Sequence, residues 1–319
     1  MKATALTVLS IPLTGAGGEP VSFPGTLGSH GLASLPPNEI GPGARSLRTT
    51  LQLADGSART VELLEEPPRT LAIRVAGRAP GARTRGEIVA AVRTMFALND
   101  DLAPLYRSLA HDAEFAFVAE GGIGRMLRSV TAFEDVVRTI CTTNCSWSGT
   151  ERMISALVEH LGTRTASAPA SGWQGRSFPS AIAMAEAPES FYRDVARAGY
   201  RGAYLRSLAR MVAGGEIDLE AWRAASRAEL PDAELEQLLL ALPGVGPYAA
   251  AHTMILFGRN SRLILDSWTR PLYAQLKGKK KIADRTIQRH FKHYGEHAGL
   301  AFWLYLWKTR HLSLETRFE

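Results

Sequence analysis

Cysteine is scarce in this sequence. The 319 residues include only two, Cys141 and Cys145, too few for the disulfide framework of a small secreted protein. Two cysteines also fall short of the four thiolates that an all-cysteine zinc site or an iron–sulfur cluster requires. The low cysteine count therefore favours a reducing cytoplasm and excludes two common kinds of metal centre.

Long apolar runs are also missing. No stretch of the sequence reaches the ~18 apolar residues that a membrane-spanning helix needs. The N-terminal segment MKATALTVLSIPLTGAGGEP has one lysine and a short apolar stretch, which is a poor match to a secretory signal peptide. We therefore expect a cytoplasmic protein that has no membrane partner.

Acidic residues are few towards the C-terminus. Residues 244–319 contain 13 Lys and Arg against 5 Asp and Glu, a local charge of +8. Because the whole chain carries a net charge of +6, the remainder is close to −2. A basic quarter attached to a near-neutral body is typical of proteins that bind a polyanion such as nucleic acid. A solvated charged face is the alternative.

The hydrophobic pattern changes once along the chain. Apolar and polar residues alternate in segments 46–53, 60–64 and 70–75, which is typical of strands in an antiparallel sheet. After residue 85 the apolar residues recur at helical spacing. The sequence thus predicts an α+β fold, with a small N-terminal antiparallel β-sheet in residues 1–85 and a mainly α-helical region in residues 86–319.

The stretch LPGVGPY at residues 242–248 joins two predicted helices, 232–241 and 247–258. Gly244 and Gly246, on either side of Val245, permit positive φ and leave no side chain over the turn. Pro247 suits the first turn of a helix. Backbone amides at the start of this helix can then approach a phosphate, which the helix dipole favours. The hairpin predicts a clamp on the DNA backbone that does not read sequence; an ordinary αα-corner is the alternative.

Asp266 follows an apolar, strand-like run in RLILDSWTR and begins a helix predicted at 267–276. A carboxylate in this place is suited to activating water or to stabilising a cationic transition state. The alternative is a plain helix N-cap, for which aspartate is among the favoured residues.

Together, LPGVGPYAA and LILDSWTR resemble the helix–hairpin–helix DNA glycosylase superfamily, in which a catalytic aspartate follows the hairpin. Two upstream segments are similar as well. ICTTNCS places Asn144 where 8-oxoguanine glycosylases carry the asparagine that fills the gap left by a flipped base. AGYRGAYLRSLARMV, which contains Tyr200, resembles a helix start of the same family. The resemblance covers about residues 120–319, and the N-terminal sheet agrees with the 8-oxoguanine and alkyladenine branches.

The resemblance also implies how the helical region is divided. One lobe is expected at residues 131–258, ending in the helix–hairpin–helix at 232–258. The second lobe combines residues 86–130 with 259–319.

Tyr248 departs from the pattern of the bifunctional members, which carry a lysine at this position. That lysine attacks the sugar C1′ and forms a Schiff base. A phenol, with a reference pKa of ~10, cannot form an imine. The resemblance therefore implies the monofunctional route through Asp266 and water, with Tyr248 lining the base pocket or stacking on the flipped base. A core position in the hairpin is the alternative.

Three further features concern specificity and DNA contact. His252, one turn after Tyr248, is a candidate for the base pocket or a satisfied core histidine. Phe302 takes the place of a glutamine with which 8-oxoguanine enzymes read the base, so specificity for 8-oxoguanine is not expected. A basic loop is the last candidate for phosphate contact, with a solvated loop as its alternative: Lys277, Lys279 and Lys280, together with Lys281.

The leading hypothesis is a monofunctional DNA glycosylase that acts as a monomer on double-stranded DNA containing a damaged base. Its nucleoid-associated site of action would be cytoplasmic. A non-catalytic protein that binds damaged DNA is the second hypothesis, and a bifunctional enzyme with a lysine from the 277–281 loop is the third. No cofactor or metal ligand set is expected, apart from a monovalent cation at the hairpin carbonyls, which similar hairpins often hold.

Overall fold

The computed structural model describes residues 6–315, and for residues 309–315 it describes the backbone alone. The N-terminal part is one five-stranded antiparallel sheet in the order β1-β5-β4-β3-β2. Its centre consists of the three expected strands: β3 (Ser46–Gln52), β4 (Ala58–Glu66) and β5 (Thr70–Val75). Two edge strands are additional to the prediction: β1 (Thr7–Pro12) and the two-residue β2 (Glu39–Ile40).

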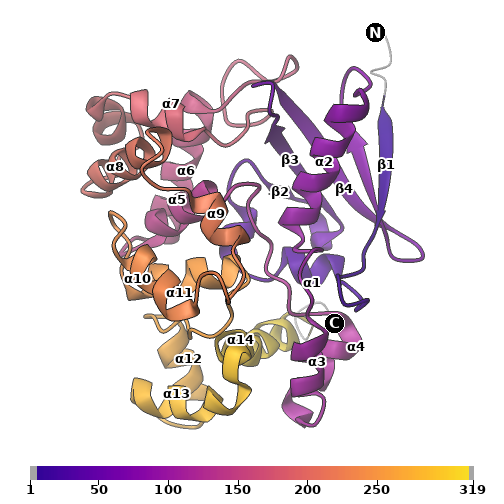
Figure 1. Cartoon of the computed structure of the whole chain (residues 1–319), viewed down its shortest axis with the longest axis vertical. Coiled ribbons are helices and arrows are strands. Elements are labelled where there is room, and N and C mark those ends of the chain that lie inside the picture. The colour runs from indigo at the N-terminus through magenta and orange to yellow at the C-terminus, as the bar shows by residue number, and fades with distance from the viewer. Residues whose placement is uncertain (1–5, 316–319) are drawn as a thin grey trace.

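Helices make up most of the remaining fold (Figure 1). Before the hairpin they are α1 (Phe23–Leu27), α2 (Ala82–Met95), α3 (Ala103–Leu109), α4 (Ala116–Gly121), α5 (Ala132–Thr142), α6 (Trp147–Leu161), α7 (Ala181–Glu186), α8 (Arg201–Ala213) and α9 (Leu219–Ala224). The hairpin and the C-terminal part contribute α10 (Asp232–Leu240), α11 (Pro247–Leu256), α12 (Thr269–Leu276), α13 (Asp284–Phe291) and α14 (Ala298–Glu315). The predicted α+β class is confirmed.

The buried apolar side chains form three clusters. The first contains the inner faces of α5–α8 and of the hairpin helices α10 and α11. The second lies between the sheet and α2, which contributes Ile88 and Val92. The third joins α3 and α4 to α12–α14, so it combines chain segments that are far apart in sequence. Helix α2 therefore packs on the sheet, whereas α3 and α4 pack on the C-terminal helices; the exact domain limits stay a prediction.

Local sequence signals explain several helix starts. The side chain of Thr131 accepts a hydrogen bond from the amide of Glu134 and caps α5, as the Thr-x-x-Glu pattern predicts. The carboxylate of Glu134 does not complete the capping box, because it pairs with Arg138 one turn later. Buried side chains on both sides of α5 place this helix at the centre of the first cluster.

The strand-like run before Asp266 is extended but lies outside the sheet. Ile264 packs in the first cluster, whereas Leu263 and Leu265 pack against the third. The alternation of apolar contacts thus has period two, as in a strand, but the neighbours on both sides are helices. The run therefore passes between the first and third clusters and places Asp266 at their boundary.

Candidate functional site

The predicted hairpin is present between α10 and α11. Gly244 has a φ of +79°, and a Cβ on it would lie 2.9 Å from the Tyr204 ring. Gly246 has an ordinary φ of −99°, and a Cβ on it would meet nothing within 4 Å. Gly244 is therefore required by the fold of the turn, whereas the space above Gly246 is open. Gly246 also starts α11, where the first amides have no partner within the helix.

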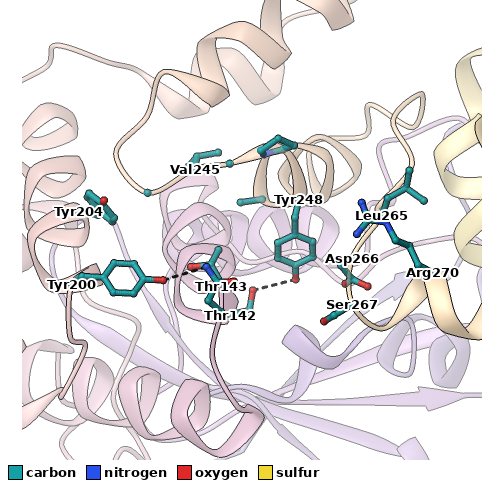
Figure 2. A pocket seen from close by; sticks show the side chains of 15 residues that line it. Thr142, Thr143, Tyr200, Tyr204, Val245, Tyr248, Leu265, Asp266, Ser267 and Arg270 are labelled. Atoms are coloured by element: carbon teal, nitrogen blue, oxygen red, sulfur yellow. Dashed lines mark hydrogen bonds between the residues drawn. The ribbon is translucent and has the colours of Figure 1, made fainter. Parts of the chain in front are cut away.

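A pocket of about 620 Å³ opens beside this hairpin (Figure 2). Four chain segments line it: the end of α5, the start of α8, the hairpin turn and the Asp266 loop. The lining residues are Thr142, Thr143, Asn144, Tyr200, Tyr204, Gly244, Val245, Gly246, Pro247, Tyr248, Ala249, Leu265, Asp266, Ser267 and Arg270. The structure thus brings the expected hairpin, Asp266, Tyr248, Asn144 and Tyr200 to one place.

Asp266 has a structural contact and a free oxygen. Its Oδ1 accepts hydrogen bonds from the amides of Trp268 at 2.8 Å and Thr269 at 2.6 Å, so it orders the start of α12. The Thr269 hydroxyl in turn accepts the Asp266 amide at 2.9 Å. Both the N-cap interpretation and the functional one are therefore compatible, since Oδ2 is left for the pocket, where Figure 2 shows the carboxylate beside Tyr248.

Tyr248 is held by a directed chain of hydrogen bonds. The Thr142 hydroxyl donates to the carbonyl of Thr139 at 2.7 Å, so at its 3.1 Å contact with Tyr248 it accepts from the phenol. Because the phenol proton is then used, Nδ1 of His252 is the donor in its 3.3 Å contact with the phenol oxygen. The ring of Tyr248 is thus fixed at the pocket wall. Burial raises the pKa of Tyr248, and the charge of Asp266 acts in the same direction, so the phenol stays neutral.

His252 lies behind the pocket wall rather than in it. Its imidazole is buried, and this burial lowers its pKa to about 4, so it is neutral at physiological pH. With Nδ1 protonated, Nε2 is a bare acceptor, and it has no hydrogen-bond partner among the described residues. The rings of Tyr248 and Trp303 lie 5.7 and 6.0 Å from it. His252 therefore supports Tyr248 from behind.

The structure does not place Phe302 in the pocket. Phe302 is fully buried in the third cluster, with the rings of Phe291 and Tyr273 at 5.3 and 6.0 Å. Successive residues of a helix point in different directions, and the next residue, Trp303, packs against the first cluster instead. Its ring contacts His252 and lies 5.9 Å from Trp268. Phe302 therefore lies outside the lining of the pocket, and its expected base-pocket position is wrong.

Asn144 is exposed at the pocket mouth, in a left-handed conformation with a φ of +45°. The buried Arg201 donates hydrogen bonds to the carbonyls of Thr143 and Asn144, which fixes this turn. The amide of Asn144 donates to the Tyr200 hydroxyl at 3.5 Å, and the Tyr200 ring is 55% exposed. Asn144 and Tyr200 thus form one exposed pair facing the hairpin across the pocket.

The basic loop after α12 lies outside the lining. The ammonium of Lys277 is 4.7 Å from the centre of the Tyr305 ring, a cation–π contact. Lys279 and Lys280 are exposed. The only cation among the lining residues is Arg270, which makes two 2.8 Å hydrogen bonds to Asp284. A role of the lysines in contacting phosphate stays a prediction.

Among the side chains of residues 6–308, no group of three His, Cys, Asp or Glu residues is placed to hold a metal ion. No helix within residues 6–315 has the length and apolar character needed to cross a membrane.

Comparison with known structures identifies the fold. The chain is similar to a 3-methyladenine DNA glycosylase from Archaeoglobus fulgidus, with a TM-score of 0.70 and 18% identity over 94% of this chain and 98% of that one. It is also similar to the 8-oxoguanine glycosylase/lyase of Clostridium acetobutylicum in its apo-form, with a TM-score of 0.60 and 19% identity over 84% of this chain and 98% of that one.

The same Clostridium enzyme in complex with double-stranded DNA containing cytosine opposite to 8-oxoG gives a TM-score of 0.62 and 18% identity, covering 88% of this chain and 99% of that one. No protein-family model and no curated protein matches the sequence. The chain therefore has the fold of the DNA glycosylases, as the resemblance of its motifs implies.

Several pocket residues are additional to the sequence prediction. Thr142 and Tyr204 lie inside the motifs ICTTN and GYRGAYL, but within these motifs only Asn144 and Tyr200 are predicted as site residues. Arg201 lies in the second motif too, but its role depends on carbonyls 57 and 58 residues away. Arg270 follows Asp266 by four residues, and this spacing of about one helical turn indicates that the two side chains lie on the same side.

Proposed function

We propose that this protein is a monofunctional DNA glycosylase. The observation that carries the proposal is the position of the Asp266 carboxylate, which faces the same pocket as the Tyr248 ring, next to the open start of α11. The hairpin amides would hold a phosphate of the damaged strand. The flipped nucleotide would enter the pocket with its sugar towards Asp266 and its base towards Tyr248.

In the proposed reaction, the bond between C1′ and the base nitrogen breaks and the base leaves with the electron pair. The sugar becomes oxocarbenium-like, and the negative charge of Asp266 stabilises it. Water then bonds to C1′ and transfers a proton to Asp266 or to the departing base. Tyr248 contributes no nucleophile, because its phenol is neutral and its proton is donated to Thr142.

The position of Tyr248 in the pocket wall supports a monofunctional glycosylase over a glycosylase/lyase. Among the fifteen lining residues there is no lysine that could form a Schiff base. Lys277 is the first lysine of the basic loop, and it is engaged over the Tyr305 ring. The non-catalytic alternative would use Asp266 only to order the start of α12, and it gives no role to the carboxylate oxygen that faces the pocket.

The test is a panel of duplexes that each contain one alkylated, oxidised or deaminated base, incubated with the protein and then treated with hot alkali. We expect strand cleavage that requires the alkali treatment with at least one lesion. Tight binding to an abasic duplex with no base release from any lesion would favour the binding protein instead. Trapping of a covalent complex by borohydride would overturn the monofunctional assignment.

A further inference from the structure

A second concave surface lies on α13, outside the Asp266 pocket. This basic groove has a volume of about 480 Å³. Its lining residues are Ser261, Arg262, Leu263, Arg285, Gln288, Arg289, Lys292, Gly295 and Ala298. Four of the nine are cationic and none is acidic, so the groove is suited to an anionic ligand.

The charges of the groove are only partly compensated. Arg262 pairs with Glu236 at 2.7 Å, and the acidic residue of α13, Asp284, pairs with Arg270. Among the side chains of residues 6–308, Arg285, Arg289 and Lys292 form no ion pair. Arg285 and Arg289 are spaced by one turn of α13 and Lys292 follows directly after its last residue, so three like charges lie close together and repel one another. An external anion would remove this repulsion.

The groove is physically connected to the pocket. Asp284, at the start of α13, holds Arg270, which lines the Asp266 pocket. The run 262–265 joins the two sites a second time, because Leu263 lines the groove and Leu265 lines the pocket. Helix α13 has eight residues, or roughly 12 Å. At ~3.4 Å of duplex axis per base pair, this length corresponds to about three or four base pairs.

We propose that the basic groove holds backbone phosphates of one duplex arm, within about four base pairs of the nucleotide in the Asp266 pocket, because α13 extends over this length from the contact between Asp284 and Arg270. The inference rests on the proposed function, since it assumes that the pocket receives a nucleotide of duplex DNA. Guanidinium groups suit a phosphate because their donors match its oxygens in pairs. No aromatic side chain lines the groove, so it offers no platform for unpaired bases and favours the backbone of a duplex over a single strand.

The test combines a variant of the protein with neutralised DNA. Arg285→Gln/Arg289→Gln/Lys292→Gln removes the three unpaired charges of the groove and changes no residue that lines the Asp266 pocket. The control Arg48→Gln/Arg78→Gln/Arg83→Gln removes three exposed charges from the sheet region and α2. Binding to a long duplex with a central abasic analogue is measured between 50 and 200 mM salt, so no turnover is needed. We expect the slope of log K against log salt to fall by up to about 2.7 in the groove variant, for three phosphates, and to stay unchanged in the control.

Methylphosphonate linkages, placed in short patches along either arm of the duplex, locate the contact. One patch within about four base pairs of the analogue should weaken binding of the wild type but not of the groove variant, because the variant has already lost this contact. Equal responses of the two proteins to every patch would overturn the proposal, as would an unchanged salt slope. The proposal would also be overturned if polyglutamate bound the wild type and not the groove variant while the two proteins bound DNA with equal affinity. If the protein releases a base but the wild type and the groove variant have equal salt slopes, only the groove proposal is refuted. If the groove variant has the smaller salt slope but no base is released from any lesion, only the proposed glycosylase activity is refuted.

Discussion

Nδ1 of His252 donates a hydrogen bond to the phenol oxygen of Tyr248 across 3.3 Å. This direction follows from the neighbouring carbonyl of Thr139, which can only accept and therefore orients the Thr142 hydroxyl and then the phenol. Because burial lowers the pKa of His252 to about 4, its imidazole is neutral at physiological pH, with its single ring proton on Nδ1. Tyr248 presents its ring to the pocket, while both functions of its hydroxyl are used within the protein.

The first prediction concerns stability against pH. The pKa of His252 is lowered to about 4 in the folded protein, against about 6.5 when unfolded. Between these values the unfolded chain binds the extra proton, so stability is full above pH 6.5 and falls as the pH decreases towards 4. The loss attributable to His252 is about 3 kcal/mol. In His252→Phe this pH-dependent loss of stability should disappear, which urea unfolding at pH 7, 5.5 and 4.5 would measure. Identical pH profiles of the variant and the wild type would contradict the prediction.

The second prediction concerns the missing amine. Tyr248→Lys places a primary amine at the pocket wall, where it can attack C1′. We expect borohydride to trap a covalent complex of this variant with lesion-containing DNA, and none of the wild type. Tyr248→Phe is the matched control, since it keeps the ring and lacks both hydroxyl and amine. It should also yield no trapped complex, and it should lose about 1 kcal/mol of stability with the phenol hydrogen bonds.

The third prediction isolates the charge of Asp266. In Asp266→Asn the side-chain oxygen can still accept the amides of Trp268 and Thr269, so the start of α12 is preserved. The negative charge at the pocket is lost. Base release under single-turnover conditions should fall by about 10²- to 10⁴-fold, while affinity for an abasic duplex is kept or slightly raised by the reduced repulsion. Turnover at the wild-type rate would remove Asp266 from its proposed role.

The fourth prediction separates the two hairpin glycines. Gly244→Ala forces a side chain into a positive φ and against Tyr204, so it should lower the stability of the fold by about 1 kcal/mol or more. Gly246→Ala meets no atom within 4 Å and should leave the melting temperature nearly unchanged. Its methyl group would, however, occupy the open side of the turn.

DNA affinity therefore discriminates between an αα-corner and a phosphate clamp. If the hairpin amides hold a phosphate, Gly246→Ala should weaken binding several-fold without destabilising the protein. Full affinity in this variant would indicate that the turn is an ordinary corner.

Much of this protein was determined by local sequence. The alternating segments specify β3–β5, the Thr131 pattern specifies the start of α5, and LPGVGPY specifies the hairpin, because each depends on side chains and backbone conformations within a few residues. The short edge strand β2 carries too few residues for a periodic signal and exists because β3 is beside it.

Tertiary structure alone decided which residues meet at the pocket. Thr142 and Tyr248 are 106 residues apart, and only the packing of α5 against α11 brings their hydroxyls together. Whether Phe302 or Trp303 packs against His252 depended on the rotation of α14 about its own axis, which its apolar, aromatic-rich sequence leaves open because nearly every face is hydrophobic. The basic groove, likewise, required α13 to lie beside the run 262–265, a contact that no local pattern encodes.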